Sequence, residues 1–244
     1  MGKTRKLKCG GEQFVYSPEL PISDEKIIWN RIDLQPNKQI QKIYKDGSVI
    51  IGKEKIKLTS AISPAEGFHL YDLIMRNNYS NILEVGLANG LSSLYILQAL
   101  KDNGTNGNLT SIDPFQSTQW KSAGISNIKN AELDQNHKLI EKKSFVALPE
   151  LLAESDTKYD LIFIDGMHLF DYTLIDMFYS ILLCKIGGVI VIDDILHKAP
   201  AKVVKFIDNN YKFMRRMQPL PVKTVATYLK TDDDSRNWDH FSGF

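Results

Sequence analysis

Short apolar runs of strand length alternate with helical stretches from about residue 61 onward, and this alternation constrains the fold more than any other feature. The run Tyr159–Ile164 is almost entirely apolar, and Val189–Ile192 is entirely so. Such continuous apolar strands are typical of a parallel sheet covered by helices on both faces, because both sides of each strand are then buried. The pattern therefore predicts an α/β fold.

Seven strands and the helices between them are predicted along this region. The strands are Asn81–Gly86, Leu109–Ile112, an extended piece at Leu139-Ile140, Tyr159–Ile164, Val189–Ile192, Lys212–Met217 and Thr224–Lys230. The helices are one that starts at Ser63-Pro64-Ala65-Glu66, then Leu91–Leu100, much of 117–157, Tyr172–Cys184 and about 201–210. We expect Gly187-Gly188 to end the helix that precedes it. The last two strands form a closing antiparallel pair, so the expected fold is a Rossmann-like, doubly wound, seven-stranded sheet, mostly parallel with a closing antiparallel strand.

The chain divides into three regions. Residues 1–60 are polar, and we interpret them as an extension with a tail and a small hairpin in Ile40–Leu58. The hairpin is expected to turn at Asp46-Gly47, a dipeptide favoured in such turns. Residues 61–230 form the α/β domain, and residues 231–244 form an acidic and aromatic tail. We expect the extension to cap a substrate or to contact a second copy of the chain.

Net charge and cysteine content narrow the classes of function. The chain has 244 residues, with 30 Lys and Arg against 29 Asp and Glu, so its formal net charge is +1. This balance weighs against nucleic-acid binding, which needs a clear cationic excess. The two cysteines, Cys9 and Cys184, are far apart and have no zinc-ligand spacing, so a cytoplasmic location is expected. The longest apolar runs have only strand length, so we expect no membrane partner.

Four of the predicted strands end in polar segments that carry acidic residues, where the chain turns over the sheet. They lie in Glu84–Gly90, at Asp113, in Asp165–His168 and at Asp193-Asp194. In open α/β sheets, ligands bind outside the carboxyl ends of the strands. A helix cap would explain any one of these residues, but four at one edge favour a functional site.

The first of these segments is a glycine turn between a strand and a helix. Gly86 and Gly90 let the backbone approach a ligand, and the N-terminus of the next helix offers N–H groups to an anion. The turn is not the dinucleotide fingerprint, because Ala88 stands where the second glycine would be. Asp113 can accept both hydroxyls of a ribose. Glu84 lies inside a buried strand, so it should have a cationic or hydrogen-bonding partner.

These segments together resemble a known family. Ile82-Leu83-Glu84-Val85-Gly86, with Gly90, Ser92 and Asp113, resembles the cofactor site of class I S-adenosylmethionine (SAM)-dependent methyltransferases. Phe163-Ile164-Asp165-Gly166 with His168, and Gly187–Asp194, resemble the metal-dependent small-molecule O-methyltransferases of the catechol and macrocin types. The resemblance covers about residues 61–230.

The resemblance implies a role for each matching residue. Glu84 and the turn with Gly86, Asn89 and Gly90 would contact the methionine part of SAM, Ser92 its carboxylate, Asp113 the ribose, and Phe115 and Ser144 the adenine. Asp165 would border the cofactor and, with Asp193 and Asp194, bind a divalent metal such as Mg²⁺. His168 falls where relatives have a Lys or His base.

Elementary chemistry is consistent with these roles. Mg²⁺ prefers carboxylate oxygens and keeps positions open for substrate oxygens. A bound cation acidifies a hydroxyl, and His168, whose unperturbed pKa lies near neutrality, can take its proton. Two other interpretations stay open. His168 can make a structural hydrogen bond or lie beside a metal, and the Asp193-Asp194 pair also occurs in relatives whose use of a metal is not settled.

Other chemistries fit the sequence less well. Amino-methylating DNA enzymes need an Asp/Asn-Pro-Pro-aromatic loop where this chain has Ile164-Asp165-Gly166-Met167, and neither cysteine follows a proline, as cytosine C5 enzymes require. We therefore expect an enzyme that methylates a hydroxyl of a small molecule such as a sugar, a phenol or a natural product. The alternatives are a catalytically silent relative that binds cofactor or a partner, and a hydroxylase-like member of the same fold. The chain is also expected to be able to form a homo-oligomer through its N-terminal hairpin.

Overall fold

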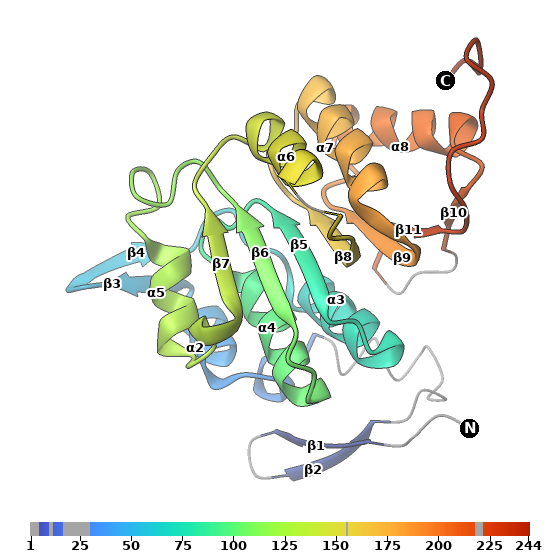
Figure 1. Ribbon diagram of the computed structural model, residues 1–244. Helices are drawn as coiled ribbons and strands as arrows, with labels where there is room; N and C mark the ends of the chain where they lie inside the picture. Colours follow the sequence, from blue (N-terminus) through green and yellow to red (C-terminus); the bar gives the residue numbers. More distant parts are fainter. Residues whose placement is uncertain (1–4, 10–11, 17–29, 155, 218–221) are drawn as a thin grey trace.

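The fold is that of a doubly wound α/β domain. The structure is a computed structural model that describes residues 5–9, 12–16, 30–154, 156–217 and 222–244. Within these residues, seven strands form one sheet in the order β10-β11-β9-β8-β5-β6-β7 (Figure 1). They are β5 (Asn81–Val85), β6 (Asn108–Ile112), β7 (His137–Ile140), β8 (Tyr159–Ile164), β9 (Cys184–Ile192), β10 (Met214–Arg216) and β11 (Ala226–Lys230). β5 to β9 pair in parallel, and β11 runs antiparallel to both β9 and β10. The predicted fold class is confirmed.

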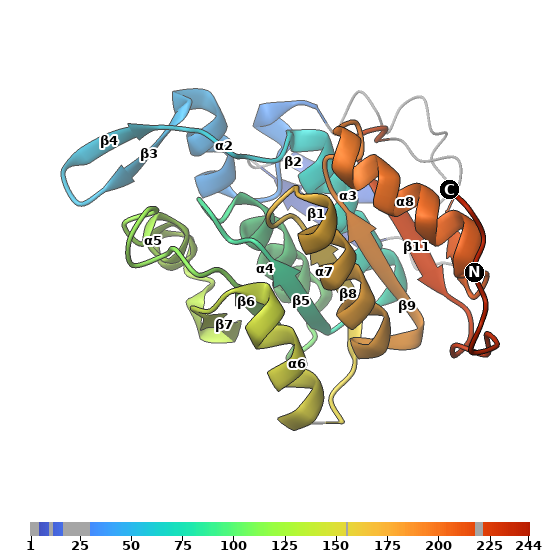
Figure 2. The same ribbon diagram turned by 90° about the horizontal axis from the view of Figure 1, so that it is seen from above.

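Helices cover both faces of this sheet (Figures 1 and 2). One face carries α3 (Pro64–Asn77), α4 (Leu91–Asn103) and α5 (Ala123–Asn130), and the other carries α6 (Ser144–Glu154), α7 (Phe170–Leu183) and α8 (Lys198–Asn210). Each face has its own apolar core, with Leu94 of α4 in one and Met177 of α7 in the other. This two-sided burial explains why the strands are apolar throughout.

The predicted start of the first domain helix is confirmed. The Ser63 hydroxyl accepts the backbone N–H of Glu66, and the Glu66 carboxylate accepts the N–H of Ser63, which is a capping box. Pro64 occupies the first turn, where its missing N–H is no loss. The helix ends at Asn78, whose φ is 57°.

The predicted hairpin in Ile40–Leu58 is wrong in its first half. Residues Lys38–Asp46 form helix α2, capped by the Asn37 side chain, with Ile40 and Ile43 buried on one face. Gly47, with φ 56°, ends this helix and does not form a hairpin turn. The hairpin comes later, between β3 (Ser48–Ile51) and β4 (Glu54–Lys57). Asp46-Gly47 suits either role, because glycine in the left-handed conformation serves helix ends as well as hairpins.

The N-terminal extension is attached to α4 by hydrogen bonds. The Tyr95 hydroxyl donates to Gln35 Oε1 (2.6 Å), and Asn37 Nδ2 donates to Gln98 Oε1 (2.7 Å). A short 3-10 helix, η1 (Ile32–Leu34), precedes these contacts. The expected N-terminal tail is partly strand, because β1 (Arg5–Cys9) pairs with β2 (Glu12–Tyr16), and residues 1–4 lie outside the described residues.

The glycine pair in β9 and the C-terminal tail complete the description of the fold. Gly187-Gly188 do not end a helix as expected, since α7 stops at Leu183 and the two glycines lie within β9, beside an irregularity in its pairing with β8. The Phe244 ring packs against Phe170 and Phe206, with centroids 6.3 and 5.0 Å away. Among the described helices, none is long and apolar enough to cross a membrane.

Candidate active site

The predicted site residues lie in one row at the carboxyl edge of the sheet. Ile112, Val85, Ile164 and Ile192 stand side by side in register on β6, β5, β8 and β9. The next residue of each strand is Asp113, Gly86, Asp165 and Asp193. The ladder continues one residue further, because Gly86 N–H donates to the Ile112 carbonyl and Asp165 N–H to the Val85 carbonyl. β5 lies between β6 and β8, at the switch point where such sheets bind ligands.

The glycine turn is tightly built against the strand beside it. Gly86, Ala88 and Gly90 all have positive φ, of 98°, 44° and 78°. A β-carbon on Gly86 would lie 2.0 Å from the Asp165 carbonyl oxygen, so glycine is required there by contact as well as by conformation. The turn therefore lies directly against the backbone that carries Asp165.

Asp113 organises this turn from the neighbouring strand. Its Oδ2 accepts the backbone N–H groups of Leu87 (3.2 Å) and Ala88 (2.8 Å), and its Oδ1 accepts that of Phe115 (2.8 Å). The side chain is only 3% exposed. The hydrogen bonds of Asp113 thus hold the turn in place. Its contact with a ribose remains a prediction.

Glu84 is buried beneath the turn and is fully hydrogen-bonded. Its carboxylate accepts the hydroxyls of Ser92 (2.5 Å), Ser93 (2.5 Å) and Ser111 (2.6 Å). The hydrogen-bonding partner expected for Glu84 is therefore present, in the form of three serine hydroxyls. Burial raises the pKa of Glu84, and the three hydroxyls oppose that rise. Because the Ser92 hydroxyl donates to Glu84, the part of Ser92 that is available to an anionic ligand is its backbone N–H in the first turn of α4.

Asn89 and Gly90 connect the turn to two other segments. Asn89 Nδ2 donates to the Thr59 carbonyl of the N-terminal extension (2.6 Å), and the Asn89 carbonyl accepts from Asn127 of α5 (2.9 Å). A β-carbon on Gly90 would lie 2.9 Å from Cα of Gly124. Sequence reasoning missed Gly124 and Asn127, whose only signal was their place in a predicted helix.

The two predicted adenine contacts differ in surroundings. Phe115 is 37% exposed, directly after the Asp113-Pro114 turn. Ser144 is the first residue of α6 and hydrogen-bonds to the carboxylate of Asp176 on α7. Burial raises the pKa of Asp176 to about 6. Sequence reasoning did not single out Asp176, because an acidic residue within an apolar helix has no distinguishing pattern.

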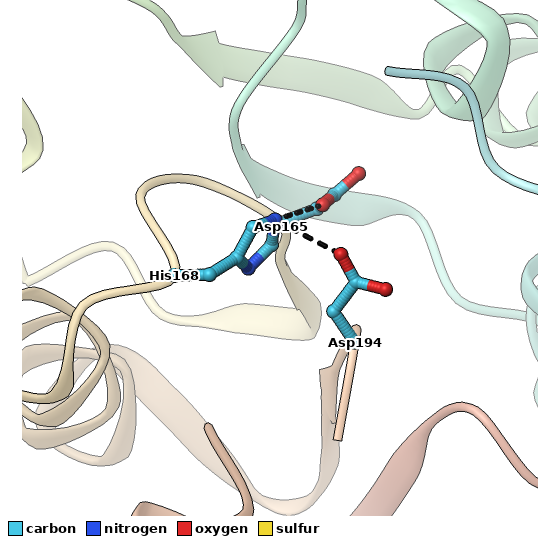
Figure 3. A group of neighbouring side chains, drawn as sticks. All are labelled: Asp165, His168 and Asp194. Atoms are coloured by element: carbon cyan, nitrogen blue, oxygen red, sulfur yellow. Dashed lines mark ion pairs between the residues drawn. The ribbon is translucent and has the colours of Figure 1, made fainter. Parts of the chain in front are cut away.

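Asp165, His168 and Asp194 form a cluster whose potential ligand atoms all lie within 4.8 Å of one another. His168 Nε2 lies 3.2 Å from Asp194 Oδ2 and 3.6 Å from Asp165 Oδ1, and Figure 3 shows the three side chains converging from two loops. Asp194 has φ 54°, a conformation that is uncommon outside glycine and is worth noting at a candidate site.

The third predicted metal ligand, Asp193, lies outside this cluster. Its Oδ1 accepts the N–H of Asp194 (2.7 Å), and the side chain is 5% exposed. Burial, and next the charge of Glu66, raise the pKa of Asp193 to about 8. The structure thus groups His168 with Asp165 and Asp194, where the sequence suggested three aspartates.

The electrostatics of the cluster follow from burial and from like charges. Burial raises the pKa of Asp165 well above its ordinary value, and the charges of Asp193 and Asp194 add to that rise. Burial lowers the pKa of His168, with Asp194 opposing. Among the described residues, the ion-pair partners of Asp165 and Asp194 are histidines, not lysines or arginines. The raised pKa values mean that ionising these carboxyl groups together is unfavourable, and a bound cation would stabilise their charged forms.

A second histidine and several apolar side chains border the cluster. The His197 ring stacks on His168 with centroids 6.2 Å apart, and its Nε2 lies 3.7 Å from Asp194 Oδ1. Met167 and Leu196, next to these histidines in the chain, are 50% and 73% exposed. Two exposed apolar side chains are thus adjacent in the chain to the histidines of the site.

Comparisons with known proteins agree with this geometry. Residues 83–195 match the model of a methyltransferase domain. A search of curated proteins found no significant match.

Three solved structures are similar to this chain in fold. An O-methyltransferase from Bacillus cereus in complex with SAH has 18% identity and TM-score 0.60, covering 71% of this chain and 84% of its own. TomG from Streptomyces achromogenes, an O-methyltransferase of tomaymycin synthesis in complex with SAM, has 20% identity and TM-score 0.58, covering 72% and 84%. Cofactor-bound Rv0187 from MTB has 17% identity and TM-score 0.60, covering 82% of this chain and 100% of its own.

The domain match spans the segment that holds the whole candidate site, from β5 to the residue after Asp194. At these identities the solved structures establish the fold, and that fold is the one the sequence predicted. The fold that the resemblance to class I methyltransferases implied is thereby confirmed.

Proposed function

We propose that this chain, which carries a methyltransferase domain of the class I fold, transfers the methyl group of SAM to a hydroxyl oxygen of a small molecule. A divalent cation and His168 assist the transfer in this proposal. The acceptor is a phenol, a sugar hydroxyl or a related natural product.

One observation carries the proposal: the glycine turn and the acidic cluster are in contact. Gly86 packs against the carbonyl of Asp165, and the side chain of Asp165 belongs to the cluster with His168 and Asp194. A cofactor seated on the turn would therefore present its reactive end beside groups that can bind a cation and accept a proton.

The turn suits a cofactor with a carboxylate, a ribose and a positively charged sulfur. The first turn of α4 offers backbone N–H groups that lack partners within the helix, which favours binding of an anion. Asp113 and Glu84 are buried carboxylates, one bonded to the turn and the other to the first turn of α4, and negative charge there would favour a cofactor with cationic groups. When bound, SAM would supply a methyl group on positively charged sulfur, so that a bond from the acceptor oxygen to the methyl carbon would form as the carbon–sulfur bond breaks, with its electron pair left on sulfur.

The donor set fits a divalent cation. Asp165 and Asp194 would hold it through carboxylate oxygens, with Asp193 close enough for its charge to raise the pKa of Asp165. Carboxylates are the ligands that Mg²⁺ and Mn²⁺ prefer. When bound, such an ion would acidify the acceptor hydroxyl and fix its position.

His168 acts as the base in this proposal. Burial lowers the pKa of His168, so its imidazole is neutral near pH 7. Nε2 lies beside Asp194 and Asp165 and would donate to a carboxylate, which leaves Nδ1 to take the hydroxyl proton. The same carboxylates would stabilise the imidazolium that forms. Met167 and Leu196 provide apolar surface for the rest of the acceptor.

Calorimetry and kinetics with a panel of phenols and sugars test the proposal. SAM should bind, turnover should require Mg²⁺ or Mn²⁺, and EDTA should abolish it. His168→Ala should lower kcat at least about 100-fold with SAM affinity unchanged, whereas His197→Ala, a matched histidine on the rim, should change kcat far less.

Metal titration of the same variants separates a base from a ligand. If His168→Ala keeps the cation affinity but loses turnover, His168 is the base; a parallel loss of cation affinity would contradict that role. SAM binding without turnover of any hydroxyl in the panel would favour the catalytically silent alternative. Full turnover in EDTA would rule out the cation.

A further inference from the structure

Gln116 is a buried residue whose side-chain amide joins two parts of the candidate site. It lies in the loop after β6, three residues beyond Asp113, and is 1% exposed. Its Nε2 donates to the Ala88 carbonyl in the glycine turn (2.8 Å) and to Asp113 Oδ2 (3.2 Å). Sequence reasoning did not single out this residue.

The oxygen of the same amide has no partner. Among the described residues, Gln116 Oε1 is buried without a hydrogen-bond donor. A buried acceptor without a partner is destabilising, so an apolar side chain of similar length would suit this position at least as well if packing were its only role. The two bonds that Nε2 makes therefore explain why an amide stands here.

The bond to Ala88 fixes the orientation of one peptide group. The carbonyl of Ala88 and the N–H of Asn89 belong to the same planar trans peptide, so they point in opposite directions. Because Gln116 holds the carbonyl, the Asn89 N–H is turned away from Gln116. This peptide lies at the centre of the turn that the Gly90 N–H closes on the Leu87 carbonyl (2.7 Å). Central peptides of such turns adopt two opposite orientations, and Gln116 stabilises one of them.

The Asn89 N–H lies next in the chain to other unpaired donors at the start of α4. Among the described residues, the N–H groups of Asn89, Leu91 and Ser92 have no hydrogen-bond acceptor, although these residues are only 4%, 2% and 5% exposed. Buried backbone donors are almost always paired in folded proteins, so these three indicate an acceptor that a ligand supplies. A carboxylate, with two acceptor oxygens and a negative charge, fits such a set at a helix N-terminus.

We propose that Gln116 is a positioning residue that makes the glycine turn selective for the carboxylate of SAM. When Gln116 holds the Ala88 carbonyl, the N–H of Asn89 is available to the carboxylate beside the first turn of α4. If that peptide were reversed, the Ala88 carbonyl would take the place of the N–H and would repel the carboxylate. The inference rests on the proposed binding of SAM, and it is independent of the cation, the base and the acceptor.

Asn127 provides a matched comparison on the next carbonyl of the turn. Its Nδ2 donates to the Asn89 carbonyl (2.9 Å), and like Gln116 it is 1% exposed. The N–H of the same peptide belongs to Gly90 and is already bound to the Leu87 carbonyl, so Asn127 orients no donor toward a ligand. Loss of the Asn127 amide should therefore loosen the turn without changing its selectivity.

Calorimetry with SAM and with decarboxylated SAM, which lacks only the carboxylate, tests the role of Gln116. The wild type should bind SAM at least about tenfold more tightly than decarboxylated SAM. Gln116→Met should weaken the binding of SAM at least about tenfold and that of decarboxylated SAM less than about threefold, so that most of the selectivity is lost. Asn127→Leu should weaken the binding of both ligands by the same factor.

Urea unfolding of the same variants separates selectivity from folding. Gln116→Met should shift the unfolding midpoint by less than about 0.5 M, because methionine has a similar size and removes an unpaired oxygen. Gln35→Met is a second control, since Gln35 is 0% exposed and is bonded to Tyr95 and to the Arg31 carbonyl. It should lower stability and leave the ratio of the two affinities unchanged.

Amide hydrogen exchange tests the orientation of the peptide directly. SAM should slow the exchange of the Asn89 N–H in the wild type and in Asn127→Leu, because the carboxylate accepts that hydrogen. In Gln116→Met, SAM should leave the exchange of Asn89 much less protected.

Two outcomes would overturn the inference alone. They are a wild type that binds SAM and decarboxylated SAM equally well, and a Gln116→Met variant that loses affinity for both ligands by the same factor, which would make Gln116 a purely structural residue. A chain that binds no SAM would overturn the proposed function as well. The expected affinities without methyl transfer to any acceptor would contradict the proposed function and support the role of Gln116.

Discussion

Gly86 and Asp165 lie so close that a β-carbon on Gly86 would meet the Asp165 carbonyl oxygen at 2.0 Å. The Asp165 N–H donates to the Val85 carbonyl (2.8 Å), so a backbone hydrogen bond joins the two segments next to this contact. The turn that is proposed to seat SAM therefore packs directly against the loop that carries the acidic cluster. This closeness suits a reaction between a bound cofactor and an acceptor held at the cluster.

Gly86→Ala should destabilise the chain and abolish SAM binding. A residue with a β-carbon costs about 1–2 kcal/mol in the left-handed region, and the overlap with backbone at Asp165 adds to that. Gly104→Ala is the matched control, because Gly104 also has positive φ (67°) but no described atom outside its own neighbours would lie within 4 Å of its β-carbon. Urea unfolding should show a loss of about 1 kcal/mol for Gly104→Ala and at least about 3 kcal/mol for Gly86→Ala. Equal losses would mean that the contact with Asp165 is unimportant.

Asp113→Asn should weaken the glycine turn and the cofactor site together. The carboxylate accepts N–H groups of Leu87, Ala88 and Phe115, and an amide can replace only one of its two acceptor oxygens. We expect about 2 kcal/mol less stability in urea and at least tenfold weaker SAM binding by calorimetry. Asp134→Asn, at the exposed start of the 3-10 helix η2 (Asp134–Asn136), should change neither. Unchanged SAM affinity would contradict the ribose assignment.

The sheet and its functional edge could be predicted from the sequence because both depend on local patterns. Continuous apolar runs identify buried parallel strands, and Asp113, Asp165 and Asp193 each follow directly after one. Parallel pairing then brings them to the same level without further information. The existence of β7 was predicted from only two apolar residues, Leu139-Ile140, whereas its place at the edge of the sheet was not.

The features that could not be predicted from the sequence depend on contacts between distant segments. Asp46-Gly47 fits a hairpin turn as well as a helix end, and the burial of Ile40 and Ile43 on one helix face decides between them. Gly124 must be glycine because a β-carbon there would lie 2.8 Å from the Ala88 carbonyl, which no spacing in the sequence reveals. Adjacent aspartates also look alike in sequence, so only the fold separates Asp194, in the cluster, from Asp193, whose pKa responds to Glu66.

Glu84 should tolerate replacement by glutamine far better than by alanine. Alanine leaves the hydroxyls of Ser92, Ser93 and Ser111 buried without their acceptor, whereas glutamine keeps an oxygen in place and removes a charge whose burial is unfavourable. Urea unfolding at pH 7 should show a loss of about 4 kcal/mol for Glu84→Ala and under about 1.5 kcal/mol for Glu84→Gln. Glu154→Ala, at an exposed position, controls for loss of a glutamate. Similar losses for both variants at position 84 would mean that the hydroxyls find other acceptors.

Asp176 should make stability depend on pH in a way that Asp176→Asn removes. Burial raises the pKa of Asp176 from 3.8 to about 6, and among the described residues its Oδ1 has no hydrogen-bond partner. Between about pH 4 and pH 6, the folded chain therefore keeps a proton on Asp176 that the unfolded chain has already released. The contribution of Asp176 to stability is complete below pH 4 and is lost as pH rises through 6.

A pKa rise of about two units corresponds to about 3 kcal/mol, so above pH 7 the ionised carboxylate should destabilise the fold by roughly that amount. Asp176→Asn should gain about 2–3 kcal/mol over the wild type in urea at pH 8 and little at pH 4, since asparagine carries no charge at either pH. Asp46→Asn, at an exposed position at the end of α2, controls for the exchange of an aspartate for asparagine. A gain that is equal at pH 4 and pH 8 would mean that packing, and not the buried charge, explains the effect of the substitution.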